Sequence, residues 1–198
     1  MLPETKPGNL IIVEGIDGSG KSTQARMLAD MLEGEQYSVF LTREPGDGSM
    51  EAREAIFNLD HDAPDAPLKE LVFFEIDRAL HYQLISDMIQ NGNIVVSDRG
   101  PASTLAYQGY GRGVDLEFIR LANKIATGGR VADLTLLFDL DPEVAQKRLA
   151  ERNGENTRFD REDLAFHQAL RMGFLREAAL DLSRWVIIDA TQPEDKVF

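Results

Sequence analysis

Residues 15–22 read GIDGSGKS, which matches the pattern G-x-x-x-x-G-K-[ST]. The segment directly follows the apolar run LIIVE and precedes a stretch with helical periodicity. In loops of this pattern, glycines let backbone N–H groups surround a phosphate, the lysine contacts the β- and γ-phosphates, and the hydroxyl group binds Mg²⁺. A strand, this loop and a helix must therefore follow one another here, as in proteins that bind nucleotides on a parallel sheet.

The rest of the chain alternates short apolar runs with longer amphipathic stretches, a pattern typical of βαβ units. It predicts one domain over residues 1–198, an α/β P-loop three-layer sandwich with helices on both faces of a five-stranded parallel sheet. Ligands should collect beyond the carboxyl ends of the strands. The expected strands are 10–14, 38–42, 94–98, 134–139 and 185–189; the expected helices are 21–33, 67–91, 116–126, 142–152 and 161–183; loops are expected at 44–48 and 109–113.

Charge and cysteine content exclude several classes of function. The formal net charge of −13 repels polyanions, so we expect neither nucleic acid nor an anionic membrane as a partner. A local arginine cluster can still hold a small phosphorylated ligand. The chain has no cysteine, which excludes disulfides, thiol catalysis and Cys-ligated metals. No signal-like start and no apolar run of about 18 residues is present, so we expect a cytoplasmic protein.

The loop supplies most of the predicted ATP and magnesium contacts. Lys21 should neutralise the transferring phosphoryl group, and Ser22 should bind Mg²⁺. Asp98 ends the apolar strand 94–98 and can hold the same ion from the opposite side, while Asp139 ends another strand and is a competing candidate. The predicted ATP-binding residues here are Gly15, Ile16, Asp17, Gly18, Ser19, Gly20, Lys21, Ser22 and Thr23.

Several further phrases occur in a fixed order along the chain: EGIDGSGKST at 14–23, TREPG at 42–46, FEIDR at 74–78, SDR at 97–99 and AYQG at 106–109. Together they resemble the thymidylate kinases, P-loop enzymes that phosphorylate dTMP to dTDP with ATP. The resemblance runs from about residue 10 to 191. It implies ATP and dTMP as ligands, Mg²⁺ as the cofactor and a homodimer.

The resemblance also implies roles for particular residues. It implies that Phe74 stacks on thymine and that Arg78 hydrogen-bonds a base carbonyl. The two residues lie four apart, which places them on one face of a helix. Arg99 clamps the acceptor's 5′-phosphate, Tyr107 packs under the deoxyribose, and Asp17 positions the sugar or a magnesium-bridged phosphate. The other implied acceptor contacts are Pro45, Ser103, Thr104 and Gln108.

The phosphate loop contains no arginine, so the resemblance places the bridging positive charge in a small lid at about residues 152–161. Arg158 is the implied catalytic residue of this lid, and Arg152 contacts ATP. Thr157 replaces the usual acid, and Asn153 looks like an insertion. Residues 47–50, DGSM, also depart from the usual Gly-Gly-Thr run, so the loop over the acceptor phosphate can differ in shape.

Two alternative functions stay open from the sequence. A deoxynucleoside kinase would need a base such as Glu14 or Asp98 for a 5′-hydroxyl, whereas an arginine at position 99 suits a phosphate acceptor better. A P-loop switch or partition ATPase would need no acceptor pocket. The histidines His61, His81 and His167 lack metal-ligand spacing and are expected to be hydrogen-bonded or solvated.

Overall fold

The computed structural model describes residues 7–61, 63–151 and 162–198. A single parallel sheet of five strands has the order β2-β3-β1-β4-β5. Four strands have the predicted bounds, and the second lies one residue later than predicted. The strands are β1 (Leu10–Glu14), β2 (Val39–Arg43), β3 (Ile94–Asp98), β4 (Leu134–Asp139) and β5 (Trp185–Asp189).

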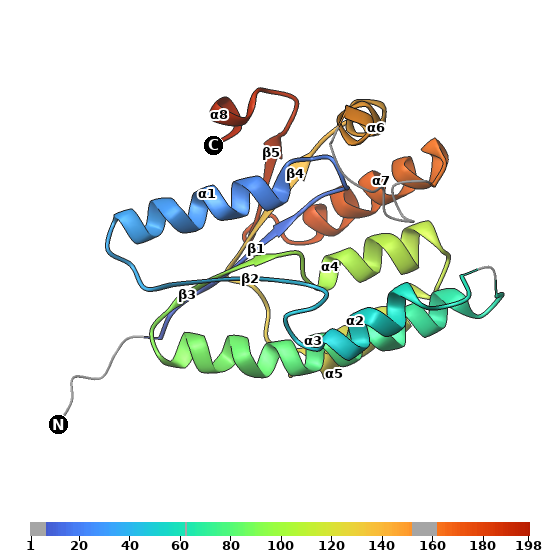
Figure 1. Ribbon diagram of the computed structural model, residues 1–198, viewed down its shortest axis with the longest axis horizontal. Helices are drawn as coiled ribbons and strands as arrows, with labels where there is room; N and C mark the ends of the chain where they lie inside the picture. The colour runs from blue at the N-terminus through green and yellow to red at the C-terminus, as the bar shows by residue number, and fades with distance from the viewer. Residues whose placement is uncertain (1–6, 62, 152–161) are drawn as a thin grey trace.

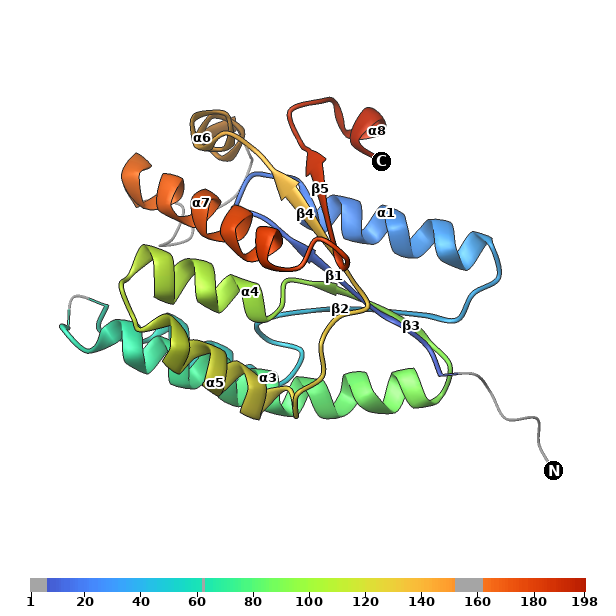
Figure 2. The ribbon, with the colours of Figure 1, turned by 180° about the vertical axis from the view of Figure 1, so that it is seen from behind.

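Successive side chains of the central strand β1 pack against helices on opposite faces of the sheet. Leu10 and Ile12 pack with residues of α3 (Ala66–Gln90), including Tyr82. Val13 points the other way and belongs to the cluster that contains Ala25 of α1 (Lys21–Gly34). Because successive side chains of a strand point to opposite faces, α1 and α3 cover opposite faces of the sheet (Figures 1 and 2).

The sheet's register brings the acidic strand ends to one edge. Val13 of β1 pairs with Asp98 of β3, and Glu14 pairs with Leu137 of β4. The phosphate loop leaves β1 at this edge and enters α1. The remaining helices are α2 (Met50–Phe57), α4 (Pro101–Thr104), the π-helix η1 (Leu105–Gly111), α5 (Leu116–Ala126), α6 (Pro142–Glu151), α7 (Leu164–Leu180) and α8 (Glu194–Val197).

The prediction of a loop at 109–113 is wrong for residues 109–111, because the π-helix runs to Gly111. The glycines there serve packing: a Cβ on Gly109 would lie 2.5 Å from the Leu116 side chain, and one on Gly111 would lie 2.6 Å from Phe166. The last long helix is shorter than predicted. It begins at Leu164, where the Asp163 carboxylate accepts a hydrogen bond from the Phe166 backbone, and ends at Leu180.

The predicted lid at 152–161, including Arg152 and Arg158, lies outside the described residues. No described helix is both long and apolar enough to cross a membrane. A cytoplasmic location stays a prediction.

Candidate active site

A cavity of about 210 Å³ opens at the carboxyl edge of the sheet, and we call it the Arg99 cavity. It contains every acceptor-side residue predicted from the sequence, brought together from the phosphate loop, the β2–α2 loop, α3, α4 and the π-helix. Those residues are Asp17, Pro45, Phe74, Arg78, Arg99, Ser103, Thr104, Tyr107 and Gln108. Asp98 also lines this cavity, as do Arg43 and Arg53.

A second cavity, of about 300 Å³, adjoins the phosphate loop, and we call it the loop cavity. It lies between Gly18–Gly20, the start of α1, Arg148 of α6 and the C-terminal segment around Pro193. The Arg148 guanidinium donates a 3.4 Å hydrogen bond to the Thr191 carbonyl, and the Gln24 amide donates to the Glu194 carbonyl at 3.0 Å. These contacts join the segment after β5 to α6 and to α1, the helix that follows the phosphate loop.

The phosphate loop needs its glycines for its path. Gly20 has φ 87°, a left-handed conformation that glycine adopts without strain, and it leads into α1. A Cβ at Gly15 would lie 2.7 Å from the Phe138 carbonyl oxygen of β4. The loop therefore lies against the sheet and leads into the N-terminus of α1, a position that generally suits an anion.

Asp17 belongs to the phosphate loop and lines the Arg99 cavity. Its carboxylate accepts hydrogen bonds from Lys21 Nζ at 2.9 Å and from the Tyr107 hydroxyl at 2.8 Å, and it forms an ion pair with Arg99. Burial acts to raise the pKa of Asp17, but the charges of Arg99 and Lys21, with these hydrogen bonds, hold it well below its usual range. An ionised carboxylate thus lies between the two cations that phosphates would contact.

Both the backbone and the guanidinium group of Arg99 are fixed in position. Its backbone has φ 77°, a left-handed conformation that costs a non-glycine residue about 1 kcal/mol or more. Its Nη1 donates to Ser103 Oγ at 3.2 Å, and its guanidinium lies 5.2 Å from the centre of the Tyr107 ring. Strain of this kind is found where a functional side chain must point in one direction.

Glu14 supports the turn that carries Arg99 and Ser103. Its fully buried carboxylate accepts hydrogen bonds from the backbone N–H groups of Gly100 (2.9 Å) and Ser103 (3.1 Å) and from Ser103 Oγ (2.7 Å). Glu14 does not line the Arg99 cavity. Burial, the dominant effect, raises its pKa from 4.5 to about 7.

This pKa predicts a pH-dependent effect of Glu14→Gln on stability. Between pH 4.5 and 7 the folded protein keeps a proton on Glu14 that the unfolded chain has released, so the wild type loses stability as the pH rises. The substituted glutamine has no such proton, so the variant should gain up to about 3 kcal/mol relative to wild type across this window. Urea unfolding at several pH values measures the difference. Parallel pH curves for the two proteins would contradict it, and Glu33→Gln, at an exposed acid of α1, is the control.

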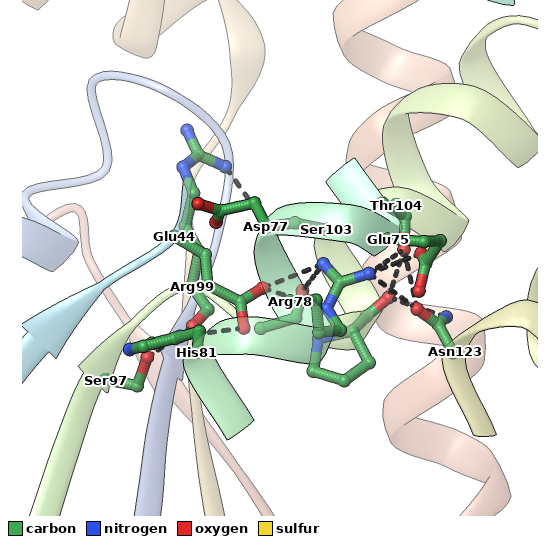
Figure 3. Close-up of polar contacts among 12 residues, drawn as sticks. Glu44, Glu75, Asp77, Arg78, His81, Ser97, Arg99, Ser103, Thr104 and Asn123 are labelled. Atoms are coloured by element: carbon green, nitrogen blue, oxygen red, sulfur yellow. Dashed lines mark hydrogen bonds and ion pairs between the residues drawn. The ribbon is translucent and has the colours of Figure 1, made fainter. Parts of the chain in front are cut away.

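Arg78 is almost completely buried and bonded through all three guanidinium nitrogens (Figure 3). Nε and Nη2 donate to Glu44 Oε2 at 2.9 and 2.8 Å, while Nη1 donates to Asn123 Oδ1 at 2.7 Å and Glu75 Oε1 at 2.5 Å. His81 lies behind Glu44, with Nδ1 3.2 Å from Glu44 Oε1. Despite burial, Arg78 and His81 lower the pKa of Glu44, so Arg78 faces a carboxylate that stays ionised.

Sequence reasoning missed Glu44, His81 and Asn123 as residues that position Arg78. The contacts of Arg78 with Glu44 and Asn123, and of His81 with Glu44, join positions 34 to 45 residues apart in the chain, and no local pattern signals them. It also missed Arg53, because it did not predict α2. Arg53 Nη1 donates to the Pro45 carbonyl at 3.0 Å and adds a positive charge to the Arg99 cavity.

The unusual residues at 47–50 have local structural roles. Asp47 accepts a hydrogen bond from Thr42 Oγ1 at 2.9 Å, and Ser49 caps α2 by accepting from the Ala52 backbone at 3.1 Å. Asp77 of α3 accepts from the backbone N–H groups of Gly46 and Ser49. The loop over the Arg99 cavity is therefore fixed to α3.

The structure separates the two candidate magnesium ligands. Asp139 is bound by Arg171, with Nε to Oδ1 at 2.7 Å and Nη2 to Oδ2 at 2.9 Å. Asp98 lines the Arg99 cavity, and its buried Oδ1 has no hydrogen-bond partner among the described residues. Ser22 is exposed at the start of α1. The Asp98 carboxylate thus keeps an oxygen without a partner among the described residues, whereas both oxygens of Asp139 are bound by Arg171.

The histidines stand apart from any metal site. Within the described ranges, no group of three or more His, Cys, Asp or Glu side chains is placed to hold a metal ion. His61 contacts Glu70 at 3.0 Å, and His81 contacts Thr42 and Glu44. Nε2 of buried His167 has no partner among the described residues, which differs from the expectation of a satisfied or solvated ring.

Comparison with known proteins adds an independent line of evidence. The family described as Thymidylate kinase matches residues 13–198. The chain is 42% identical over 195 residues to the thymidylate kinase of Desulfosudis oleivorans, covering 94% of this chain and 91% of that protein. It is 40% identical over 197 residues to the thymidylate kinase of Maridesulfovibrio salexigens, covering 95% and 90%. The crystal structure of thymidylate kinase from Ehrlichia chaffeensis superposes with a TM-score of 0.74 at 33% identity, covering 92% of this chain and 93% of that one.

Proposed function

Because the chain belongs to the thymidylate kinase family and phosphorylates dTMP to dTDP with ATP, we propose that ATP binds from the loop cavity across the phosphate loop and that dTMP binds in the Arg99 cavity. The position of Asp17 carries this assignment. Its carboxylate contacts Lys21 on the ATP side and Arg99 on the dTMP side, so the two phosphate-binding cations lie on either side of one group.

On the ATP side, the backbone of residues 15–20 surrounds the β-phosphate, and Lys21 neutralises the phosphoryl group in transfer. The base of ATP lies in the loop cavity beside Arg148, whose planar guanidinium can stack on a purine. We also propose that Arg152 and Arg158, which lie outside the described residues, supply positive charge to the ATP phosphates.

On the dTMP side, Arg99 clamps the 5′-phosphate, and Arg53 adds a second positive charge. Phe74 stacks on thymine, and Arg78 reads a base carbonyl after exchanging a weak contact, such as the 3.4 Å one to the Gly100 carbonyl. Tyr107 packs against the sugar. Pro45, Ser103, Thr104 and Gln108 complete the wall around these groups.

Ser22 and Asp98 would hold Mg²⁺ together with the ATP phosphates, since Asp98 offers a buried oxygen that the described residues leave unpartnered. When bound, Mg²⁺ neutralises phosphate charge during the transfer. The chain's own residues do the rest by positioning, because a dTMP phosphate oxygen is already largely ionised near neutral pH and attacks the γ-phosphorus as ADP leaves. No general base is needed. This separates the proposal from a nucleoside kinase. Of the two candidate bases for such an enzyme, Glu14 lies outside the Arg99 cavity and Asp98 lines it.

The function is tested by ADP release from Mg-ATP with dTMP, dUMP, dCMP, dGMP, thymidine or no acceptor, with product identified by chromatography. We expect strong dependence on dTMP and formation of dTDP. Equal ADP release without acceptor would instead indicate a switch ATPase, and a preference for thymidine would indicate a nucleoside kinase.

Phe74→Ala tests the base pocket. Loss of an aromatic face under a base is expected to raise the dTMP KM by about 10- to 100-fold and to change kcat much less. The adjacent residue Phe73 does not line the Arg99 cavity, so Phe73→Ala is the matched control. Steady-state kinetics with varied dTMP measures both. An unchanged dTMP KM in Phe74→Ala would remove this ring from the base site.

We also propose a homodimer. Four apolar residues of the long helix, at intervals of four, are 46–47% exposed on one side of α3: Leu68, Val72, Ile76 and Leu80. Phe118, Leu121 and Ile125 of α5 are also exposed. Exposed apolar rows of this length favour burial against another chain.

Ile76→Glu should convert the dimer to a monomer, because it places a charge in the middle of this apolar row. Leu180→Glu, at a 69% exposed position at the end of α7, is the control and should leave the dimer intact. Light scattering coupled to size-exclusion chromatography measures the mass. The same mass for wild type and Ile76→Glu would contradict the interface.

A further inference from the structure

A third cavity, of about 400 Å³, lies behind the turn that carries Arg99, and we call it the Arg130 cavity. Its walls come from α4, α5, the α5–β4 connection and the turn between α7 and β5, which lie around one region in Figure 2. None of its lining residues lines the Arg99 cavity or the loop cavity. Its volume is in the range of cavities that bind small molecules.

The lining combines an apolar floor with a cationic rim. Ile12, Tyr82, Pro101, Leu105 and Trp185 are among its apolar lining residues. The rim contains four cationic side chains, in a protein whose net charge is −13; they are Arg120, Lys124, Arg130 and Arg184. Acidic side chains outnumber basic ones in the whole chain, so this local excess favours an anion.

Two of the four rim cations are available for a ligand. Arg120 is bonded to Glu177 at 2.7 and 2.8 Å, and Arg184 forms an ion pair with Asp181. Lys124 and Arg130 form no ion pair with any residue that the structure describes. Of the two acids in the lining, Asp181 is paired with Arg184, and the Glu14 carboxylate accepts three hydrogen bonds from the Gly100–Ser103 turn.

The wall between this cavity and the Arg99 cavity consists of residues that hold the dTMP-binding side chains. Asn123 lines the Arg130 cavity, donates to the Pro101 carbonyl at 3.1 Å and accepts from Arg78 Nη1 at 2.7 Å (Figure 3). Glu14 lines the same cavity and holds Ser103, which in turn accepts from Arg99. A molecule that shifts either residue must shift an arginine of the acceptor site.

We propose that the Arg130 cavity is a second ligand site, which binds a small organic anion with a ring or other apolar body and alters dTMP affinity through Asn123 and Glu14. The apolar body lies against Tyr82, Leu105 and Trp185, and the anionic group contacts Arg130 and Lys124. The binding part of the proposal is independent of catalysis; its effect on dTMP rests on the proposed function.

Trp185, the single tryptophan of the chain, lines this cavity and reports on it directly. The probe is benzylphosphonate, titrated into enzyme saturated with dTMP so that the acceptor site is filled. We expect a saturable change in Trp185 emission, which inorganic phosphate and benzyl alcohol do not reproduce. Arg130→Gln and Lys124→Gln should each weaken binding about fivefold. Lys147→Gln, at an exposed cation of α6 outside the cavity, should change it less than about twofold.

Four results would overturn the site: no saturable change, a change that dTMP abolishes, an equal response to benzyl alcohol, or the same affinity in Arg130→Gln and Lys124→Gln as in wild type. Communication is tested by the dTMP KM with and without benzylphosphonate. We expect a shift of about threefold in wild type at a half-saturating benzylphosphonate concentration and a smaller shift in Arg130→Gln at that same concentration. A constant KM in wild type overturns the communication. Because the emission signal needs no phosphoryl transfer, failure of this site leaves the kinase assignment intact.

Discussion

Lys21→Ala is expected to reduce the kcat of dTMP phosphorylation by at least about 10³-fold. Lys21 is buried at the start of α1, where its ammonium group lies 2.9 Å from Asp17 and next to the loop that surrounds the ATP phosphates. Lys21 is the single basic residue of the phosphate loop at 15–22, so no other side chain of this loop can neutralise the negative charge that develops on the transferring phosphoryl group. The variant also leaves Asp17 with one cation fewer, so the site becomes more negative where phosphates must approach.

Single-turnover measurement of dTDP formation tests this loss, since it separates chemistry from product release. Lys147→Gln removes an exposed lysine of α6 and should retain wild-type kcat. Circular dichroism and thermal unfolding of both variants establish that they are folded. If Lys21→Ala keeps kcat within about tenfold of wild type, the assignment of this lysine to the phosphoryl group is wrong.

Arg99→Gln is expected to lower kcat/KM for dTMP by about 10² to 10³-fold and to change the ATP KM little. The Arg99 side chain is mostly buried and forms an ion pair with Asp17. Without it, the Asp17 carboxylate faces the 5′-phosphate with no Arg99 charge between the two anions. Repulsion between two anions then adds to the loss of a bidentate contact. The fixed backbone at φ 77° makes compensation by a neighbouring side chain difficult.

Arg112 offers a closely matched control for this variant. Like Arg99, it forms an ion pair, with Glu162 at 2.5 Å, and lies over an aromatic ring, 4.9 Å from the centre of Phe166. Its side chain is 19% exposed, against 17% for Arg99, but it does not line the Arg99 cavity. Arg112→Gln should therefore keep kcat/KM for dTMP within about threefold of wild type. Equal losses in the two variants would mean that Arg99 acts through folding rather than through the acceptor phosphate.

Local patterns in the sequence were sufficient for the sheet and for most helices. Each strand is a short apolar run that ends in an acidic or basic residue, and the phosphate loop has a spacing that permits little but a strand–loop–helix unit. The fold class follows from these repeated units. The resemblance to thymidylate kinases added the acceptor-side residues, which the fold places in one cavity.

Helix interruptions and ends were less predictable. The segment around Gly109 and Gly111 has the composition of a loop, yet these glycines continue a π-helix because Leu116 and Phe166 leave no room for a Cβ. The apolar row of α3 around Ile76 has the spacing of a core face but lies on the surface. In both cases the surroundings of the segment in the folded chain decide the outcome, and the local sequence of the segment carries no information about those surroundings.

The sequence by itself determined the sheet, the phosphate loop and the residue types that phosphate chemistry needs, because these depend on backbone preferences and spacing within a few residues. Only the tertiary structure decided how the arginines are held: Arg78 by Glu44 and Asn123, and Arg99 by Asp17, across separations of 34 to 82 residues. It also paired Asp139 with Arg171 and left Asp98 Oδ1 without a partner among the described residues, which is why we propose Asp98 rather than Asp139 as the cation ligand. A buried charge requires a partner wherever the fold can supply one, and that partner is set by packing rather than by position along the chain.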